Sequence, residues 1–269
     1  MHDFLAAIVL GIVEGVTEFL PISSTGHLIL VNQFVDFSNP SFSKMFEVVI
    51  QLGAILSVVI YFWDKLWPFG AHKPLDAKML VWQTWMKTVI AVVPALVLGA
   101  AFGGLIHDKL FNPYVVAATL IVWGIALILI ERRRREGSVD SISKLSYMTA
   151  LYIGLIQCLA MVPGTSRSAV TIIGAMLLGS TRIVAAEFSF FLAIPTMAAA
   201  SAYSLLKYGA SMSAHDAAVL AMGFAVSFVV AYAVIAFLMK FIQRHNFIPF
   251  GVYRIILGAA VIAYFILMK

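Results

Sequence analysis

Long apolar stretches recur along the chain, and short polar segments separate them. A transmembrane helix needs about 20 mostly apolar residues to cross the hydrocarbon core of a bilayer. Six stretches have about that length, at residues 44–63, 84–106, 113–131, 184–206, 216–239 and 248–268. We therefore predict an all-α integral membrane protein with six transmembrane helices.

Two further apolar stretches, residues 3–35 and 147–178, are interrupted by helix-breaking and polar residues. The first contains Pro21 and then several hydroxyl side chains, and the second contains Pro163 and then Arg167. Irregular backbone at membrane depth is tolerated only where it is buried in protein or lines a wet cavity. We predict that each stretch forms a re-entrant broken-helix hairpin, which enters and leaves on one side of the membrane beside a cavity.

The two halves of the chain share a pattern, which predicts a single membrane domain built of two repeats, residues 1–135 and 147–269. The matching positions are Gly11 with Gly154, Glu14 with Gln157, Pro21 with Pro163, and Ser24 with Ser166. Because each half has an odd number of spans, the repeats would be inverted, and the broken segments would meet near the midplane. Chance similarity is the alternative, since matching glycine, proline and serine requires little.

Composition and charge favour the same class. Hydrophobic residues make up 62% of the 269 positions and charged residues 12%, a balance that excludes a water-soluble domain of this length. The formal net charge of +5 is concentrated in three connecting segments, 64–87, 132–144 and 240–245. The positive-inside rule places these segments on the cytoplasmic side and both termini outside. Membrane topology thus explains the charge, and no nucleic acid partner is expected.

Ionisable side chains within apolar segments are candidates for function, because they are costly at membrane depth. Glu14 and Glu18 are four residues apart and share a helix face. Such a pair either shares a proton or binds a cation, and oxygen ligands of this kind suit Mg²⁺ or Ca²⁺. Glu47 and Gln51 have the same spacing and could add ligands. The alternative is that the glutamates only form hydrogen bonds to neighbouring helices.

The segment Ser23-Ser24-Thr25-Gly26-His27 could bind an anion. A helix that begins near Ser24 would direct its N–H groups and the hydroxyls toward a phosphate. His27 lies three residues after Ser24, a helical spacing that brings an imidazole near the hydroxyl, where it could act as a base or a hydrogen-bond partner. Alternatively, the serines cap the second half-helix and His27 is a packed polar residue.

Arg167 gives the sharper signal, because an arginine inside an apolar segment needs an anionic partner and its planar fork matches phosphate. The hydroxyl side chains around it are Thr165, Ser166, Ser168 and Thr171. We interpret them with Arg167 as a diphosphate cradle. The alternative is a buried ion pair, for which the candidate carboxylates are Glu14, Glu18 and Glu187. Glu187 and Arg254 are otherwise expected to bridge spans.

The segments 14–27 and 163–171 resemble the two signature motifs of the bacterial undecaprenyl-diphosphate phosphatase family, also called the bacitracin-resistance protein family. The likeness extends through residues 46–53 and 187–190. It implies a divalent-metal-dependent enzyme of the bacterial inner membrane whose site opens toward the periplasm. The implied reaction is hydrolysis of a C55 polyprenyl diphosphate to the monophosphate and inorganic phosphate. This recycles the lipid carrier for peptidoglycan and other envelope polymers and confers bacitracin resistance.

The resemblance also implies residue roles. Glu14 and Glu18 would be the essential acidic pair, His27 the catalytic histidine, and Arg167 with Ser166 the diphosphate clamp. Ser24 would be the nucleophile, with Ser23 and Thr25 beside it. We expect Ser24 to attack with help from His27, although a metal-activated water is also open.

A different class of function would use the same residues. Inverted repeats with broken helices are also the plan of secondary transporters, so a polyprenyl-phosphate flippase or an anion transporter is the alternative. The glutamate pair and a histidine next to Ser24 favour hydrolysis. A purely structural membrane subunit fits poorly with a buried Arg167. The sequence leaves open the lipid chain length and the oligomeric state, with a homodimer one of the options.

Overall fold

The computed structural model forms helices and no strands in the part of the chain that it describes, residues 2–35, 37–70, 73–133, 137–209 and 212–267. This confirms the all-α prediction. Six of the helices are long and apolar enough to cross a membrane. They are α3 (Pro40–Tyr61), α5 (Leu75–Leu110), α6 (Pro113–Arg133), α9 (Arg182–Tyr208), α10 (Ala214–Phe241) and α11 (Ile248–Leu267). All six predicted spans are therefore confirmed, and residue 268 of the last one lies outside the described residues.

The ends of the spanning helices follow local sequence signals more than apolar length. Proline occupies the first position of α3 and of α6, where its missing N–H costs nothing. The Asn39 side chain caps α3 by accepting two N–H groups of its first turn. Helix α5 begins at Leu75, well before the predicted residue 84, because the helix continues beyond its apolar core past the interfacial Trp82.

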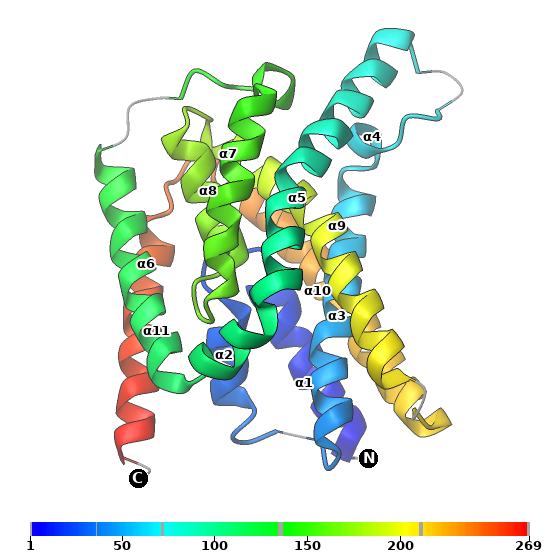
Figure 1. The fold of residues 1–269 in the computed structure, drawn as a ribbon, viewed down its shortest axis with the longest axis vertical. Coiled ribbons are helices and arrows are strands. Elements are labelled where there is room, and N and C mark those ends of the chain that lie inside the picture. The colour runs from blue at the N-terminus through cyan, green and yellow to red at the C-terminus, as the bar shows by residue number, and fades with distance from the viewer. Residues whose placement is uncertain (1, 36, 71–72, 134–136, 210–211, 268–269) are drawn as a thin grey trace.

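The two broken segments form separate short helices. The first gives α1 (His2–Thr17) and α2 (Ser24–Val31). The second gives α7 (Tyr147–Gln157), the 3₁₀ turn η2 (Cys158–Met161) and α8 (Arg167–Leu177). Figure 1 shows α1 and α2 in the half of the molecule that holds both chain ends, and α7 and α8 in the opposite half. The predicted breaks are confirmed, and the two pairs of helices approach the centre from opposite ends.

Helix packing joins the two halves of the chain throughout. Helix α10 packs on α1 and α3, α5 packs on α7 and α9, and α3 packs on α9. The pair α6 and α11 is especially close, because a Cβ atom added at Gly124 would lie 2.7 Å from the Gly251 carbonyl oxygen. This close approach brings Arg254 of α11 into the interior, where its side chain is fully buried.

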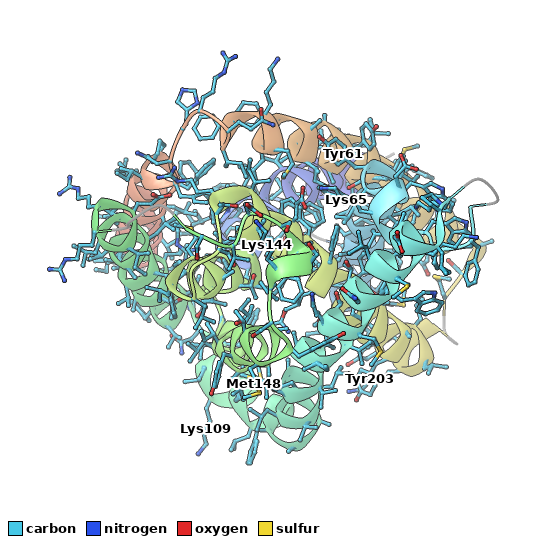
Figure 2. The ribbon with its side chains drawn as sticks, turned by 90° about the horizontal axis from the view of Figure 1, so that it is seen from above. Tyr61, Lys65, Lys109, Lys144, Met148 and Tyr203 are labelled. Atoms are coloured by element: carbon cyan, nitrogen blue, oxygen red, sulfur yellow. The ribbon has the colours of Figure 1, made fainter. Side chains whose placement is uncertain are left out.

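Salt bridges tie the helices together at the end opposite the termini, which Figure 2 views from above with Lys65 and Lys144 labelled. Lys65 of the short helix α4 (Trp63–Leu66) binds Glu187 of α9 at 2.6 Å. Arg182 of α9 binds Glu131 of α6 at 2.7 Å. Glu187 therefore links the span α9 to the short helix α4, whereas it was expected to link two spans. The described residues of the predicted basic segment 132–144 also lie at this end. Residues 134–136 of that segment lie outside the described residues.

Candidate active site

The turns that interrupt the two broken segments meet inside the protein. Ser168 at the start of α8 donates its hydroxyl to the backbone oxygens of Glu18, at 3.2 Å, and Leu20, at 3.0 Å. These two acceptors belong to the turn between α1 and α2, and the Ser168 side chain is fully buried between the turns. Ser168, which the sequence assigned to the diphosphate cradle, therefore joins the two turns in this structure.

A capping serine in an unusual backbone conformation precedes both α2 and α8. Ser23 has φ 73° and Ser166 has φ 72°, and in the described residues they are the only non-glycine residues with positive φ. Each accepts an N–H of the following helix at 3.2 Å, from Gly26 and Ala169 respectively. The capping alternative is thus confirmed for Ser23, and Ser166 caps α8 in the same way although the sequence had not suggested it. Each helix begins with N–H groups that have no partner in the helix, an arrangement suited to an anion.

Both halves contribute a side chain to the Glu18 carboxylate. Ser24 Oγ, at the first position of α2, donates to Glu18 Oε2 at 2.9 Å. Arg167 Nη2, at the first position of α8, donates to Glu18 Oε1 at 3.0 Å. The Arg167 and Glu18 side chains are only 11% and 6% exposed. The buried ion pair considered for Arg167 is confirmed, with Glu18 as its partner.

Arg167 is held at its other terminal nitrogen by α9. Its Nη1 donates to the backbone oxygen of Ser189 at 2.6 Å. Thr171, one helical turn after Arg167, donates to the Arg167 carbonyl at 2.8 Å and shares a hydrogen bond of 2.6 Å with the Ser189 hydroxyl. Ser166 likewise shares a hydrogen bond of 3.1 Å with Ser168. Of the hydroxyls predicted around Arg167, those of Ser166, Ser168 and Thr171 thus bind protein groups, whereas the buried Thr165 hydroxyl has no hydrogen-bond partner within the described residues.

His27 has hydrogen-bond partners other than the predicted one. Its Nδ1 lies 2.7 Å from the Ser23 carbonyl oxygen, and its Nε2 lies 2.7 Å from the Tyr253 hydroxyl. Because a carbonyl only accepts, we assign the proton to Nδ1, so that Nε2 accepts from Tyr253. The expectation that His27 bonds to Ser24 is therefore wrong in this structure. The Glu18 carboxylate is the better acceptor for the Ser24 hydroxyl.

Glu14 is the residue most in need of a partner. It is fully buried, and neither carboxylate oxygen accepts a hydrogen bond within the described residues. Glu18, Glu47 and Arg167 all lie close enough to act on it electrostatically. Buried acceptors without a donor are costly, and these carboxylates outnumber the one arginine among them. A hard cation would satisfy both conditions.

The remaining predicted ligands are compatible with such a cation but do not enclose it. Glu47 Oε1 accepts from Asn32 Nδ2 at 2.7 Å, and Gln51 lies one turn further along α3. Within the described ranges, no group of three His, Cys, Asp or Glu side chains is placed to hold a metal ion by itself. The residues therefore fit a divalent cation held by one or two carboxylates and completed by other oxygens, as substrate phosphates would provide.

The first helical turn of α2 carries the other predicted anion ligands. Thr25 and Gly26 follow Ser24, and Gly26 lies against Leu120 of α6, where an added Cβ atom would be 3.0 Å from a methyl group. Gly26 therefore packs closely against α6, and its backbone N–H is already bound to the Ser23 hydroxyl.

Arg254 is the main participant that the sequence interpretation undervalued. Its Nη2 donates to the backbone oxygens of Gly164 and Thr165, both at 2.9 Å, and its Nη1 donates to that of Pro21 at 3.3 Å. It thus contacts both interrupting turns and does more than bridge two spans. The signal that could have identified it is an arginine deep in an otherwise apolar span.

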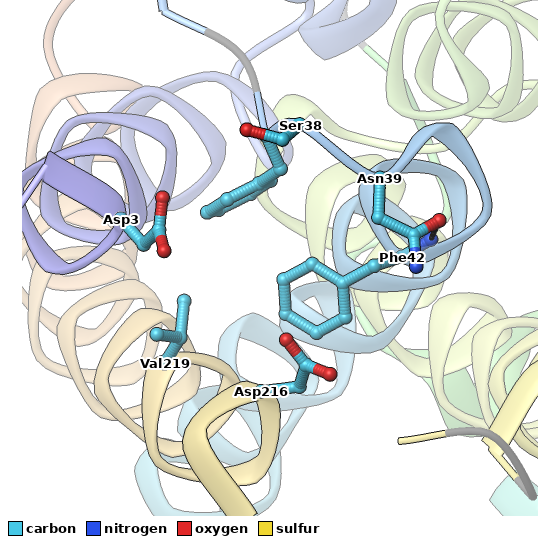
Figure 3. A pocket seen from close by; sticks show the side chains of 7 residues that line it. Asp3, Ser38, Asn39, Phe42, Asp216 and Val219 are labelled. Atoms are coloured by element: carbon cyan, nitrogen blue, oxygen red, sulfur yellow. Dashed lines mark hydrogen bonds between the residues drawn. The ribbon is translucent and has the colours of Figure 1, made fainter. Parts of the chain in front are cut away.

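A separate pocket of about 100 Å³ lies near the N-terminus, and Figure 3 shows the side chains that line it. Its lining residues are Asp3, Phe37, Ser38, Asn39, Phe42, Asp216 and Val219. None of the residues predicted for the active site is among them. The candidate site is therefore the junction of the two turns and not this pocket.

Comparisons with known proteins agree with these motifs. The family model described as bacitracin resistance protein BacA matches residues 7–260. Undecaprenyl-diphosphatase 1 of Clostridioides difficile (strain 630) is 50% identical over 268 residues, which cover 99% of this chain and 97% of the relative. The undecaprenyl-diphosphatase of Enterococcus faecalis is 46% identical over 265 residues, which cover 97% of this chain and 96% of the relative. The similarity therefore extends over both halves of the chain.

Proposed function

This chain belongs to the bacitracin resistance protein BacA family, and from that premise we propose that it hydrolyses undecaprenyl diphosphate to undecaprenyl phosphate and inorganic phosphate. The observation that carries the proposal is the convergence of Ser24 and Arg167 on Glu18. This convergence brings together the Ser24 hydroxyl, the Glu18 carboxylate as a general base and the Arg167 guanidinium as a phosphate ligand. The chain is a multi-pass membrane protein, and we assign it to the bacterial inner membrane, where the lipid carrier is recycled for cell-wall synthesis.

The chemical step that the geometry supports is attack by Ser24 on the terminal phosphorus. Glu18 Oε2 already accepts a hydrogen bond from the Ser24 hydroxyl and is placed to take its proton as the new O–P bond forms. The bond between the phosphorus and the bridging oxygen breaks, and undecaprenyl phosphate leaves with both bonding electrons. Water then cleaves the phosphoserine, which returns the hydroxyl to Ser24 and releases inorganic phosphate. Such a hydrolase acts on an acid anhydride.

Arg167 links substrate binding to this step. In this structure its guanidinium forms a salt bridge with Oε1 of Glu18. A diphosphate presents more negative charge and a geometry that suits the guanidinium fork. When the diphosphate binds Arg167, Glu18 is left to act on Ser24.

A divalent cation, Mg²⁺ or Ca²⁺, completes the site in our proposal. Glu14 and Glu18 would hold it, with Glu47 as a further ligand, and the unpartnered oxygens of Glu14 support this assignment. When bound, such an ion neutralises phosphate oxygen charge and helps to orient the diphosphate. His27, held by the Ser23 carbonyl and Tyr253, is assigned to keeping the first turn in place.

We also propose that the two halves form the inverted repeat. Supporting this, several helix contacts have counterparts when the halves are exchanged: α1 on α10 corresponds to α7 on α5, and α3 on α10 to α9 on α5. The equal φ angles of Ser23 and Ser166 support it as well. With the basic connections in the cytoplasm, α1 and α2 enter from the periplasm, and we propose that the site opens on that side.

The experiment that tests the function measures phosphate release from undecaprenyl diphosphate by the purified chain in detergent. Wild type should release phosphate, and Ser24→Ala should release almost none. In proteoliposomes, movement of labelled polyprenyl phosphate across the membrane without phosphate release in either system would overturn the proposal. That result would instead support a flippase.

A further inference from the structure

Arg254 is a buried cation whose partners are backbone carbonyls. Its side chain is fully buried, and among the described residues no carboxylate forms a salt bridge with it. All three guanidinium nitrogens donate to backbone oxygens. An unpaired charge at membrane depth is costly, so its presence calls for an explanation beyond helix bridging.

The carbonyls that Arg254 binds lie on one side of the second turn. The Thr119 hydroxyl of α6 binds the Pro163 oxygen at 2.7 Å, and Arg254 binds the next two oxygens, those of Gly164 and Thr165, at 2.9 Å each. Gly164 has φ 81°, and a Cβ atom there would lie 2.3 Å from the Thr119 hydroxyl oxygen. Three successive carbonyls of this turn are therefore directed toward α6 and α11.

The direction of a carbonyl fixes the direction of the next N–H group. In a planar trans peptide the C=O and N–H bonds point in opposite directions. Because the Thr165 carbonyl points at Arg254, the N–H of Ser166 points away from it. That N–H immediately precedes the start of α8, whose first N–H groups lack acceptors within the helix. Together they form a set of neighbouring donors of the kind that binds anions.

We propose that Arg254 is a positioning residue that orients this donor set, and through the Pro21 carbonyl the turn before α2, for the diphosphate. The inference rests on the proposed function and adds a residue of α11 to the site. Arg254 acts through the backbone and has no contact with the phosphate. The planar geometry of the Arg254 guanidinium should therefore matter for diphosphate binding in addition to its charge.

Lys87 supplies a matched control. It is also a buried cation, 3% exposed, and it donates to two backbone oxygens, those of Ile142 at 2.9 Å and Ser143 at 3.0 Å. These acceptors belong to the 3₁₀ turn η1 (Ile142–Lys144), away from the two interrupting turns. If pyrophosphate binding depends only on keeping a buried cation bound to carbonyls, substitution of either residue should weaken it. If binding depends on the orientation of the N–H donors, only substitution of Arg254 should weaken it.

The test is the affinity for inorganic pyrophosphate, measured by isothermal titration on purified, metal-loaded protein in detergent, beside the melting temperature. Arg254→Met should weaken pyrophosphate binding by roughly 10-fold or more, since one donor to a reacting oxyanion is worth about 10²–10³-fold in catalysis. Arg254→Lys should remain impaired, because an ammonium has fewer donors and no planar fork. Lys87→Met should lower the melting temperature but change the affinity less than about twofold.

Two results would overturn the inference. Wild-type affinity in folded Arg254→Met would show that the turn does not need Arg254 for its orientation. Wild-type affinity in Arg254→Lys would show that it needs only a positive charge. Equal losses of affinity in Arg254→Met and Lys87→Met would show a general structural effect. Where Arg254→Met does not fold, Arg254→Lys decides. Because pyrophosphate binding requires no turnover, failure of the hydrolase proposal would appear separately, as absent phosphate release by wild type.

Discussion

Replacing Glu18 by glutamine tests the proposed base directly. Glu18 uses its two oxygens for different partners, Oε2 for the Ser24 hydroxyl and Oε1 for Arg167. Glutamine keeps the shape but has one acceptor oxygen, so its amide nitrogen must face either the Ser24 hydroxyl or the Arg167 guanidinium. In the first case no group accepts the Ser24 proton, and in the second two donors oppose each other.

The expected loss follows from the role of a general base. Such a group contributes about 10²–10⁴-fold to rate, so kcat of Glu18→Gln should fall by that factor, or by about 2.7–5.4 kcal/mol in the activation barrier. Phosphate release from undecaprenyl diphosphate in detergent gives the measurement. Glu187→Gln is the control, because Glu187 is also a buried carboxylate bound to a cation, Lys65. A kcat for Glu18→Gln within threefold of that for Glu187→Gln would refute the reasoning.

Three further predictions concern the metal, the second turn and the topology. EDTA should abolish phosphate release and added Mg²⁺ or Ca²⁺ should restore it in wild type, whereas Glu14→Gln should not recover, since it lacks the charge that holds the ion; full activity in EDTA would refute this. Gly164→Ala should cost about 1–3 kcal/mol of stability, measured as a lower melting temperature, because an alanine at φ 81° is strained and its Cβ has no space. Gly99→Ala is the control, since nothing lies within 4 Å of its added Cβ, and an equal loss there would contradict the explanation. Lys144→Cys in a Cys158→Ser background should react with an impermeant maleimide only from the cytoplasmic side. Labelling from the periplasm would show that the protein has the opposite orientation in the membrane.

The fold could be predicted from the sequence largely because membrane helices have a strong signal. Apolar length found all six spans, and proline with nearby hydroxyl residues marked both breaks. The start of α5 was missed since a helix can continue into the interface with polar residues in its sequence. Apolar length measures the membrane-buried part of a helix and not its hydrogen-bonded length.

The site was predicted by residue type better than by contact. Glu18, Ser24 and Arg167 were each identified, and the structure brings them together. The predicted partner of His27 was wrong. Helical spacing indicates which residues are neighbours, but it does not indicate that the Ser24 hydroxyl will form its hydrogen bond with the Glu18 carboxylate. The Tyr253 hydroxyl comes from a distant helix, which no local pattern can indicate.

The structures of the two halves match at different positions from those that the sequence paired. The sequence paired Ser24 with Ser166 through the serines that follow each proline. By capping position and φ, Ser166 instead corresponds to Ser23. Ser24 then corresponds to Arg167, and both occupy the first position of their helix. The same position thus carries the proposed nucleophile in one half and the diphosphate ligand in the other.

The most direct test of the account is whether the arginine of the second half is needed for chemistry at the serine of the first. Arg167→Lys keeps the charge but loses the fork, and Arg182→Lys makes the same change at an arginine that binds Glu131 outside the site. In phosphate release from undecaprenyl diphosphate, we predict that kcat/KM of Arg167→Lys falls by about 100-fold or more, within the range for loss of a transition-state donor. Arg182→Lys should stay within a few-fold of wild type. Wild-type kcat/KM in Arg167→Lys would contradict the account.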